Sequence, residues 1–186
     1  ADSVTALFRR YSDIQVELGC DPRKCRVIGN GIRMDRFGSI EEKQPDGYID
    51  ITAVVRIHPI KDIKTMIQAF FLLKQRVPEA RLHILGDTDD EEYGRECREL
   101  IAHLGVADID MPGNVSVEEY FKRTDFTVLS SISEGQPLAV LESFAAGRPC
   151  VTTDVGCCRD LLGGTDDGIG AAGKGLPPLH ARALGD

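Results

Sequence analysis

Residues 130–147 read SSISEGQPLAVLESFAAG and join a short apolar run to a helix through a glycine-containing loop. The run itself, residues 126–130, is rich in β-formers, as expected of a buried parallel strand. Pro137 suits the first position of a helix, and Gly147 followed by Pro149 ends one. The free N–H groups and the positive dipole end at such a helix start favour an anion. We therefore predict a binding site for a negatively charged ligand at this junction.

Two carboxylates lie eight positions apart across the junction. Glu134 is in the loop, and Glu142 is in the helix, roughly 7.5 Å along its axis from Pro137. The two are too far apart to act together on one small group, but they suit the two ends of an elongated ligand. We expect Leu138 and Ala145, which share the helix face with Glu142, to point toward the core. A carboxylate beside a buried face needs a partner; the alternative is a pair of ordinary surface carboxylates.

Strand-like and helix-like segments alternate along most of the chain. This alternation predicts an α/β fold with a doubly wound, Rossmann-like parallel sheet. The predicted strands are 49–55, 81–86, 108–111, 126–130, 149–153 and one near 168–174, and the predicted helices are 62–77, 91–104, 117–123, 137–147 and 158–162.

The two ends of the chain differ from this pattern. Residues 1–18 have apolar positions at spacings of three and four, which predicts an amphipathic helix that stops at Gly19. A short strand is expected over 26–32, followed by a charged loop over 38–47. We predict three parts: 1–26 as the tail of a preceding domain with its linker helix, 27–178 as the Rossmann-like domain, and 179–186 as the start of a helix that is cut off.

The composition excludes several classes of protein. The chain has 186 residues, of which 42% are hydrophobic, so it is globular. A net charge of −8 argues against a nucleic-acid partner, which would require a basic face. No apolar run approaches the roughly 18 to 20 residues that span a bilayer, and no signal-peptide pattern opens the chain. We expect a cytoplasmic protein without direct membrane insertion.

The chain has six cysteines: Cys20, Cys25, Cys97, Cys150, Cys157 and Cys158. Their spacing matches neither paired zinc ligands nor the disulfide framework of a small secreted domain. We expect free thiols in a reducing compartment.

Ligands of open α/β sheets bind outside the carboxyl ends of the strands, so the loops that follow strands are the places to search. Arg56 and Lys61 follow the first strand of the predicted sheet and could neutralise adjacent phosphates, although ordinary solvated cations are the alternative. Gly86, after the second strand, would let a ligand approach the backbone, or is a turn glycine. Asn114 and Val115, after the third, could border a planar base or form a plain turn.

These motifs together resemble a known family. Residues 133–149 resemble the Glu-x7-Glu signature of retaining glycosyltransferases with the GT-B fold, particularly family 4. Residues 55–61 resemble its donor-phosphate segment, 28–32 its Pro-Asn-Gly-Val segment between domains, and 151–162 its following strand and helix. The resemblance covers about 27–178. The amino-acid sequences of segments 56–61 and 134–137 are most similar to those of the cytosolic glycosyltransferases of Pel-type exopolysaccharide synthesis.

The resemblance implies the C-terminal, donor-binding half of a two-domain enzyme that uses a nucleotide sugar, with a UDP-sugar such as UDP-glucose as the expected donor. Residues placed like Arg56 and Lys61 bind the diphosphate and stabilise the departing charge, so no metal cofactor is expected. The residue matching Glu134 holds sugar hydroxyls and the one matching Glu142 holds the ribose. The implied catalytic residues are Arg56, Lys61 and Glu134, and the implied donor-binding residues are Gly86, Asn114, Val115, Gly135, Gln136, Pro137, Leu138 and Glu142.

The sequence departs from the family pattern at two positions. Val55 stands where the family usually has glycine, and Asp62 where it often has glycine. The partner implied by the resemblance is an N-terminal acceptor domain, without which the chain should transfer little or no sugar; a membrane-bound complex is a further possible partner. Two other functions stay open: a non-catalytic regulatory or scaffold domain of the same fold, and a UDP-sugar epimerase.

Overall fold

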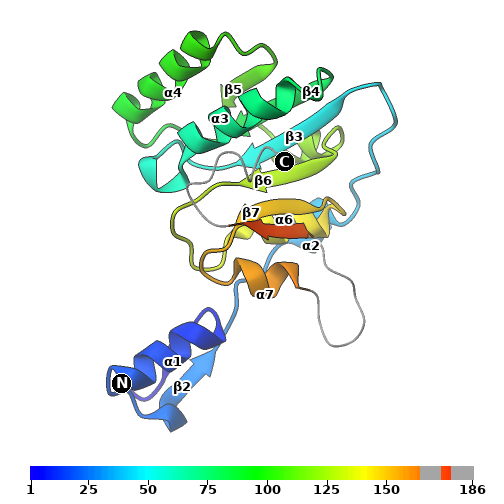
Figure 1. The fold of residues 1–186 in the computed structure, drawn as a ribbon. Coiled ribbons are helices and arrows are strands. Elements are labelled where there is room, and N and C mark those ends of the chain that lie inside the picture. The colour runs from blue at the N-terminus through cyan, green and yellow to red at the C-terminus, as the bar shows by residue number, and fades with distance from the viewer. Residues whose placement is uncertain (164–172, 177–186) are drawn as a thin grey trace.

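A computed structural model describes residues 1–163 and 173–176. Six parallel strands form one sheet in the order β5-β4-β3-β6-β7-β8 (Figure 1). The strand order reverses direction between β3 and β6, which confirms the predicted doubly wound parallel sheet. The strands are β3 (Ile49–Val54), β4 (Ala80–Leu85), β5 (Ile109–Gly113), β6 (Phe126–Leu129), β7 (Cys150–Thr153) and β8 (Gly173–Leu176).

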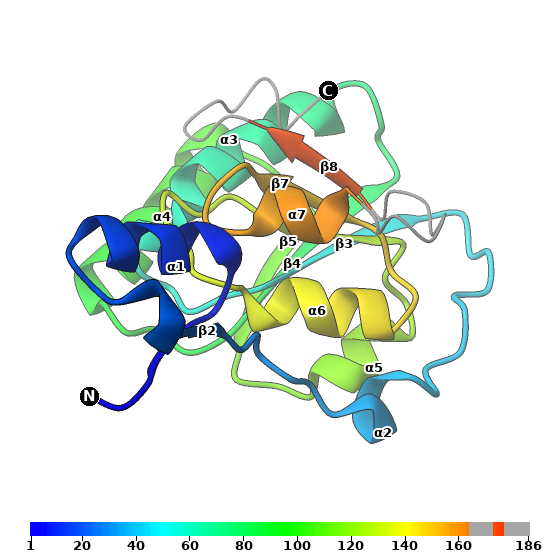
Figure 2. The ribbon, with the colours of Figure 1, turned by 90° about the horizontal axis from the view of Figure 1, so that it is seen from below.

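Among the described residues, five α-helices connect these strands, and all five were predicted. They are α3 (Ile63–Lys74), α4 (Glu91–Leu104), α5 (Val117–Phe121), α6 (Leu138–Ala145) and α7 (Cys158–Leu162). Figure 2 shows α3 and α4 on one side of the sheet and α5 and α6 on the other. The apolar face predicted for α3 is in the core, where Ile63, Met66, Ile67 and Phe70 are all buried. Within the part of the chain that the structure describes, no helix is both long and apolar enough to cross a membrane.

Local signals set most of the element boundaries. The Asp90 carboxylate accepts the Tyr93 N–H at the start of α4, and Gly105 ends that helix at a φ of 61°. Pro137 lies just outside α6 as its N-cap, because its ψ of 120° is extended; the predicted start is therefore one residue early. The late strand predicted near 168–174 is described only from Gly173 onward, and 179–186 lies outside the described residues.

The N-terminal residues differ from the predicted single helix. Residues Val4–Ala6 form β1, and the helix α1 covers only Arg9–Glu17. The prediction over 1–18 was wrong at its start because β1 pairs in parallel with β2 (Cys25–Val27), a tertiary contact that overrides helical periodicity. The strand predicted over 26–32 ends at Val27. Figure 1 shows this β1-α1-β2 unit beside the large sheet; its assignment as the tail of a preceding domain stays a prediction.

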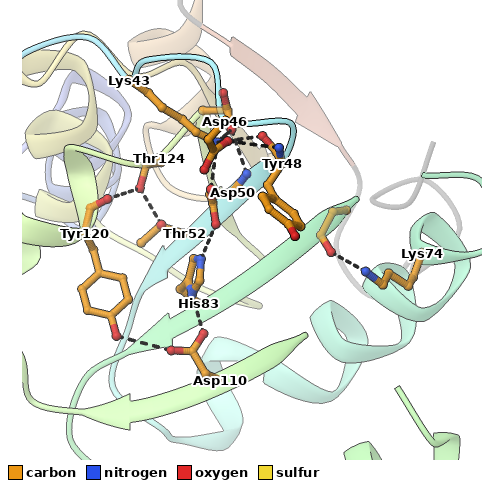
Figure 3. A network of polar contacts seen from close by, with 12 residues as sticks. Lys43, Asp46, Tyr48, Asp50, Thr52, Lys74, His83, Asp110, Tyr120 and Thr124 are labelled. Carbon is orange, nitrogen blue, oxygen red and sulfur yellow. Dashed lines mark hydrogen bonds and ion pairs between the residues drawn. The ribbon is translucent and has the colours of Figure 1, made fainter. Parts of the chain in front are cut away.

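The segment between the N-terminal unit and the sheet contains a one-turn helix, α2 (Met34–Phe37), and then the predicted loop. Lys43 anchors this mostly polar loop, whose single large apolar residue, Ile40, packs against Phe37 and Phe121. Its side chain is only 7% exposed, and its Nζ donates to Asp50 at 2.8 Å and to Asp125 at 2.6 Å (Figure 3). The charged loop is therefore held to the sheet by buried ion pairs.

A polar network continues from Lys43 across three strands (Figure 3). Asp50 on β3 lies 2.7 Å from Nε2 of His83 on β4, and Nδ1 of the same imidazole contacts Asp110 on β5. The Tyr120 hydroxyl donates to Asp110 at 3.3 Å. Asp50 is near the amino end of its strand, away from the edge where a ligand is expected. These side chains satisfy one another, so the network is structural.

Acid should destabilise the chain through this network. Burial opposes ionisation of Asp50, but hydrogen bonds from Lys43 and His83 outweigh it and hold the pKa of Asp50 below its usual value of 3.8. A depressed pKa contributes stability above the unfolded value that is lost as pH falls through the folded value. Asp50→Asn should cost about 3 kcal/mol at neutral pH, because it leaves Lys43 with one carboxylate fewer. The substitution should also make the midpoint of urea unfolding less dependent on pH in acid. Asp13→Asn, on the exposed face of α1, should change neither the stability at neutral pH nor this pH dependence.

Candidate functional site

A cleft of about 450 Å³ lies at the carboxyl ends of β3, β4 and β6, where the strand order reverses. This is the edge of an open α/β sheet at which ligands bind. Eight of the predicted site residues line it: Arg56, Lys61, Gly86, Asn114, Glu134, Pro137, Leu138 and Glu142. Val115, Gly135 and Gln136 are not among its lining residues, whereas Asp87, Leu129 and Ala139, which were not predicted, are.

Lys61 and Glu134 form an ion pair inside the cleft. Lys61 Nζ donates to Glu134 Oε1 at 2.5 Å, and the two side chains are only 16% and 11% exposed. The Ser131 hydroxyl donates to the same oxygen at 2.7 Å, so neither contact uses Oε2. The sequence did not predict this pair, because its members lie 73 positions apart and meet only when β3 and β6 become neighbours.

The loops that carry the pair are bonded to each other. The Ser130 hydroxyl donates to the Lys61 carbonyl at 2.8 Å and to that of Asp62 at 3.0 Å. Asp62 has a left-handed φ of 48°, a conformation that glycine adopts easily and aspartate tolerates. This explains how Asp62 replaces the glycine of the family pattern. Val55, at the other departure, is buried and continues the β3 ladder by donating to Leu85 O at 2.8 Å.

Arg56 stands at the mouth of the cleft. Its Nη1 lies 2.5 Å from Asp89, and its side chain is 66% exposed. An exposed pair of this kind contributes about 0 to 1 kcal/mol. Asp89 therefore places the guanidinium at the mouth without holding it tightly, and Arg56 can turn to a doubly charged anion.

The start of α6 faces the cleft. Pro137 as N-cap offers no side-chain acceptor, and the first helical hydrogen bond from Val140 N to Pro137 O is 3.3 Å long. The N–H groups of Leu138 and Ala139 precede that bond, so they and the helix dipole favour an anion. The expectation that Leu138 faces the core was wrong, since it is 48% exposed. The helix instead buries Val140 and Ser143, whose hydroxyl lies 2.7 Å from Thr127 Oγ1 on β6.

Glu142 lines the cleft one turn into α6 and is half-buried. Burial raises the pKa of Glu142 above its usual value, and the nearby charge of Arg36 opposes this only in part. Arg36 is already occupied, because its Nε lies 2.5 Å from Glu118 Oε1 and this bond lowers the pKa of Glu118 to about 2. Glu142 is thus a half-buried acceptor in a cleft, available to hydroxyl donors of a ligand.

Glu142→Gln should raise the melting temperature of the free protein at neutral pH. A raised pKa means that the charged form is disfavoured in the folded state, so stability is full below the usual value of 4.5 and declines as pH rises through the folded value. Glutamine keeps the neutral state at every pH. The gain should therefore disappear in acid, and thermal unfolding at two pH values measures it. A melting temperature lowered equally at both pH values would contradict this account.

Gly86 has a φ of 142°, and a Cβ on it would lie 2.0 Å from the Val55 carbonyl oxygen. The glycine is therefore required by the close packing of β3 against the end of β4, independently of any ligand. Next to it, Asn114 Nδ2 donates to Asp87 Oδ2 at 3.2 Å. This bond joins the loops that follow β5 and β4 across the floor of the cleft.

The loop that carries Glu134 is hydrogen-bonded to other segments on its side away from the cleft. The side chain of Gln136 faces the linker instead of the cleft, because Asn30 N donates to Gln136 Oε1 at 2.5 Å. Asn30 Nδ2 donates to the backbone carbonyl of Gln136 at 2.9 Å. The Cys157 N–H donates to Gly135 O at 3.0 Å. Sequence spacing predicted contact of this loop with a ligand, but it gave no sign of the linker contact.

A second groove of about 720 Å³ lies on the other side of Glu134. It runs between α1 and the start of α7, and Figure 2 shows α1 to the left of α7. Its charged lining residues are Arg9, Arg10, Asp13, Glu134, Asp154, Arg159 and Asp160. Glu134 therefore lies between two hollows. Among the described residues, no three His, Cys, Asp or Glu side chains gather as a metal site.

Residues 37–174 match the family described as glycosyl transferases group 1. The chain belongs to this family. A Salmonella typhimurium glycosyltransferase assigned to colanic acid biosynthesis, WcaL, is 32% identical over 90% of this chain and 42% of its own length. The D-inositol 3-phosphate glycosyltransferase of Streptomyces scabiei is 27% identical over 100% of this chain and 44% of its own.

Solved structures share the fold of this chain. Anabaena HepE in complex with UDP-glucose superposes with a TM-score of 0.81 at 18% identity, over 100% of this chain and 52% of that one. The fold is that of one domain of a two-domain GT-B enzyme. The chain spans about two fifths of the length of the curated relatives described above.

Proposed function

We propose that this chain is the donor-binding half of a retaining glycosyltransferase that takes its sugar from a UDP-sugar, with UDP-glucose as the first donor to test. The observation that carries the proposal is the grouping of Arg56, Lys61, the start of α6 and Glu142 around one cleft. Two cations and a helix start suit a diphosphate. A half-buried carboxylate suits the ribose diol. The complex of HepE with UDP-glucose is consistent with this class of donor.

In this proposal, Lys61 and Arg56 stabilise the charge that develops on the leaving diphosphate, which is electrostatic catalysis. Because these side chains provide the positive charge, we propose that no metal is needed. Glu134, fixed by Lys61 and Ser131, is placed to accept hydroxyl groups of the sugar. Asn114 borders the base, and Pro137, Leu138 and Ala139 present their backbone to the sugar and phosphates. Gly135 and Gln136, which the sequence also assigned to donor binding, support this loop from the side away from the cleft.

The acceptor would approach from the opposite side of Glu134. The second groove reaches the same carboxylate between α1 and α7, so an acceptor there would face the sugar held in the first cleft. The rest of the acceptor site would come from an N-terminal domain. The similarity to the colanic acid enzyme favours polysaccharide synthesis, and we propose a cytoplasmic enzyme of exopolysaccharide synthesis, of which the Pel type is one candidate.

Calorimetric titration with UDP tests the donor site. We expect weak but saturable binding of UDP, weaker binding of UMP and little binding of uridine, because the diphosphate meets most of the positive charge. Absence of UDP binding both by this chain and by the longest protein that contains it would overturn the proposal.

Product analysis separates transfer from the two other functions. The longest protein that contains this sequence should release UDP and transfer the sugar with its anomeric configuration retained. Conversion of UDP-glucose into an epimer would identify an epimerase. UDP binding without turnover in the presence of candidate acceptors would identify a regulatory domain.

A further inference from the structure

Two of the six cysteines lie in contact with each other. The Sγ atoms of Cys20 and Cys25 are 3.4 Å apart, and both residues are half-buried. The other four free thiols, Cys97, Cys150, Cys157 and Cys158, are buried. Cys20 and Cys25 are therefore the pair among the cysteines that a small reagent in solution can reach.

The backbone on both sides of this pair is fixed by the same small unit. Cys20 follows α1, and its N–H donates to Gln15 O at 2.9 Å. Cys25 is the first residue of β2 and pairs with Val4 on β1. Between them, the single turn η1 (Pro22–Lys24) is capped by Asp21, whose carboxylate accepts the Arg23 N–H. A disulfide bond is about 2.05 Å long, so the two sulfurs, which are 3.4 Å apart, must still approach each other before the bond forms.

The contact between the sulfurs also affects their acidity. The hydrogen bond between the Cys25 and Cys20 thiols is the main reason that the pKa of Cys25 is raised. Either thiol can donate across such a contact, and the thiolate is the nucleophile in exchange, so either sulfur can begin the attack on an external disulfide.

We propose that Cys20 and Cys25 are a thiol–disulfide exchange site, which a glutathione-type small-molecule disulfide converts reversibly into an intramolecular disulfide. The thiolate of one of the two cysteines attacks one sulfur of the small disulfide, breaks its S–S bond and releases one thiolate. The other cysteine, on losing its proton, attacks the protein sulfur of the mixed disulfide and releases the second thiolate. Two electrons and two protons pass from the protein thiols to the small disulfide, which leaves as two thiols.

The disulfide bond would lie at the start of the linker segment that contacts the loop carrying Glu134. β2 continues directly into the linker, where Asn30 bonds Gln136 beside Glu134. A disulfide restricts the unfolded state of the loop it closes, so the oxidised turn between Cys20 and Cys25 should resist local unfolding and proteolysis better than the reduced one. The cleft residues lie outside the closed loop, and UDP binding should be the same in both forms.

Incubation with oxidised glutathione followed by acid quenching and intact-mass measurement tests the site. We expect the wild-type chain to lose two hydrogens without retaining glutathione, with peptide mapping placing the bond between Cys20 and Cys25, and dithiothreitol to reverse it. Cys25→Ser and Cys20→Ser should each stop at the intermediate with one glutathione on the remaining cysteine of the pair, and Cys97→Ser should behave as the wild type.

Three results would overturn the inference: stable glutathione adducts on the wild-type chain, a disulfide that involves one of the buried cysteines, or a complete intramolecular disulfide in either the Cys20→Ser or the Cys25→Ser variant. Circular dichroism of each variant confirms that it is folded before the products are compared. The outcome is independent of the UDP titration, so either proposal can fail without the other.

Discussion

Replacing Lys61 by alanine is expected to weaken UDP binding by about 10- to 100-fold, which corresponds to the roughly 1.5 to 3 kcal/mol of a hydrogen bond to a charged group. The ammonium group acts on phosphate, so uridine affinity should change by less than about twofold. Parallel calorimetric titrations with UDP and uridine measure the difference. Equal losses for the two ligands would contradict a phosphate role for Lys61.

Controls separate lost charge from lost structure. Lys64→Ala removes a lysine three residues further on, which pairs with Glu96 away from the cleft lining, and should leave UDP binding unchanged. Lys61→Ala also leaves Glu134 without its cation in a mostly buried position, so the variant should lose stability. The double variant with Glu134→Gln should recover much of that stability but not the affinity. Recovery of both would mean that Lys61 acts only through folding.

Gly86→Ala is expected to destabilise the chain by about 3 to 5 kcal/mol, among the largest effects of a single methyl group. The new Cβ would lie 2.0 Å from the Val55 carbonyl oxygen, where atoms in folded proteins do not approach. Neither partner can yield easily, because Val55 N donates to Leu85 O at 2.8 Å and Gly86 N to Gly113 O at 2.9 Å. Urea unfolding at equilibrium measures the loss.

Gly105→Ala is the matched control for this substitution. Gly105 also has a positive φ, 61°, but a Cβ there would meet open space. Its cost should be only about 1 kcal/mol, from the left-handed backbone alone. Similar losses at the two positions would show that backbone conformation decides the effect, and that the close approach of Val55 does not.

The position of Glu142 in the cleft explains why its carboxylate lowers the stability of the ligand-free protein. Its carboxylate is partly removed from water, yet Arg36, the nearby cation, is bound to Glu118. A ligand that donates hydroxyl hydrogens to Glu142 would compensate for this loss of hydration. Stability given up in the free state at a binding cleft is a common feature of functional sites.

Much of the fold was predictable because its signals are local. Helix α3 has its apolar face at the predicted positions, and α7 has the predicted bounds. The loops that follow β3, β4 and β6 were identified as site loops from topology alone, since parallel strands present their carboxyl ends at one edge. The N-terminal helix was overextended because β1 is short and becomes a strand only by pairing with β2.

Local sequence patterns by themselves determined the order of strands, helices and motifs. They also determined the helix start after Glu134. Which side chains meet was decided only by the tertiary structure. Lys61 reaches Glu134 across 73 positions, and Gln136 turns to Asn30 across 106. Leu138 is exposed because the pairing of Ser143 with Thr127 fixes the rotation of α6 on the sheet. Local propensity depends on neighbours in the chain, whereas partner choice depends on which strands pack together, and no spacing along the sequence encodes that.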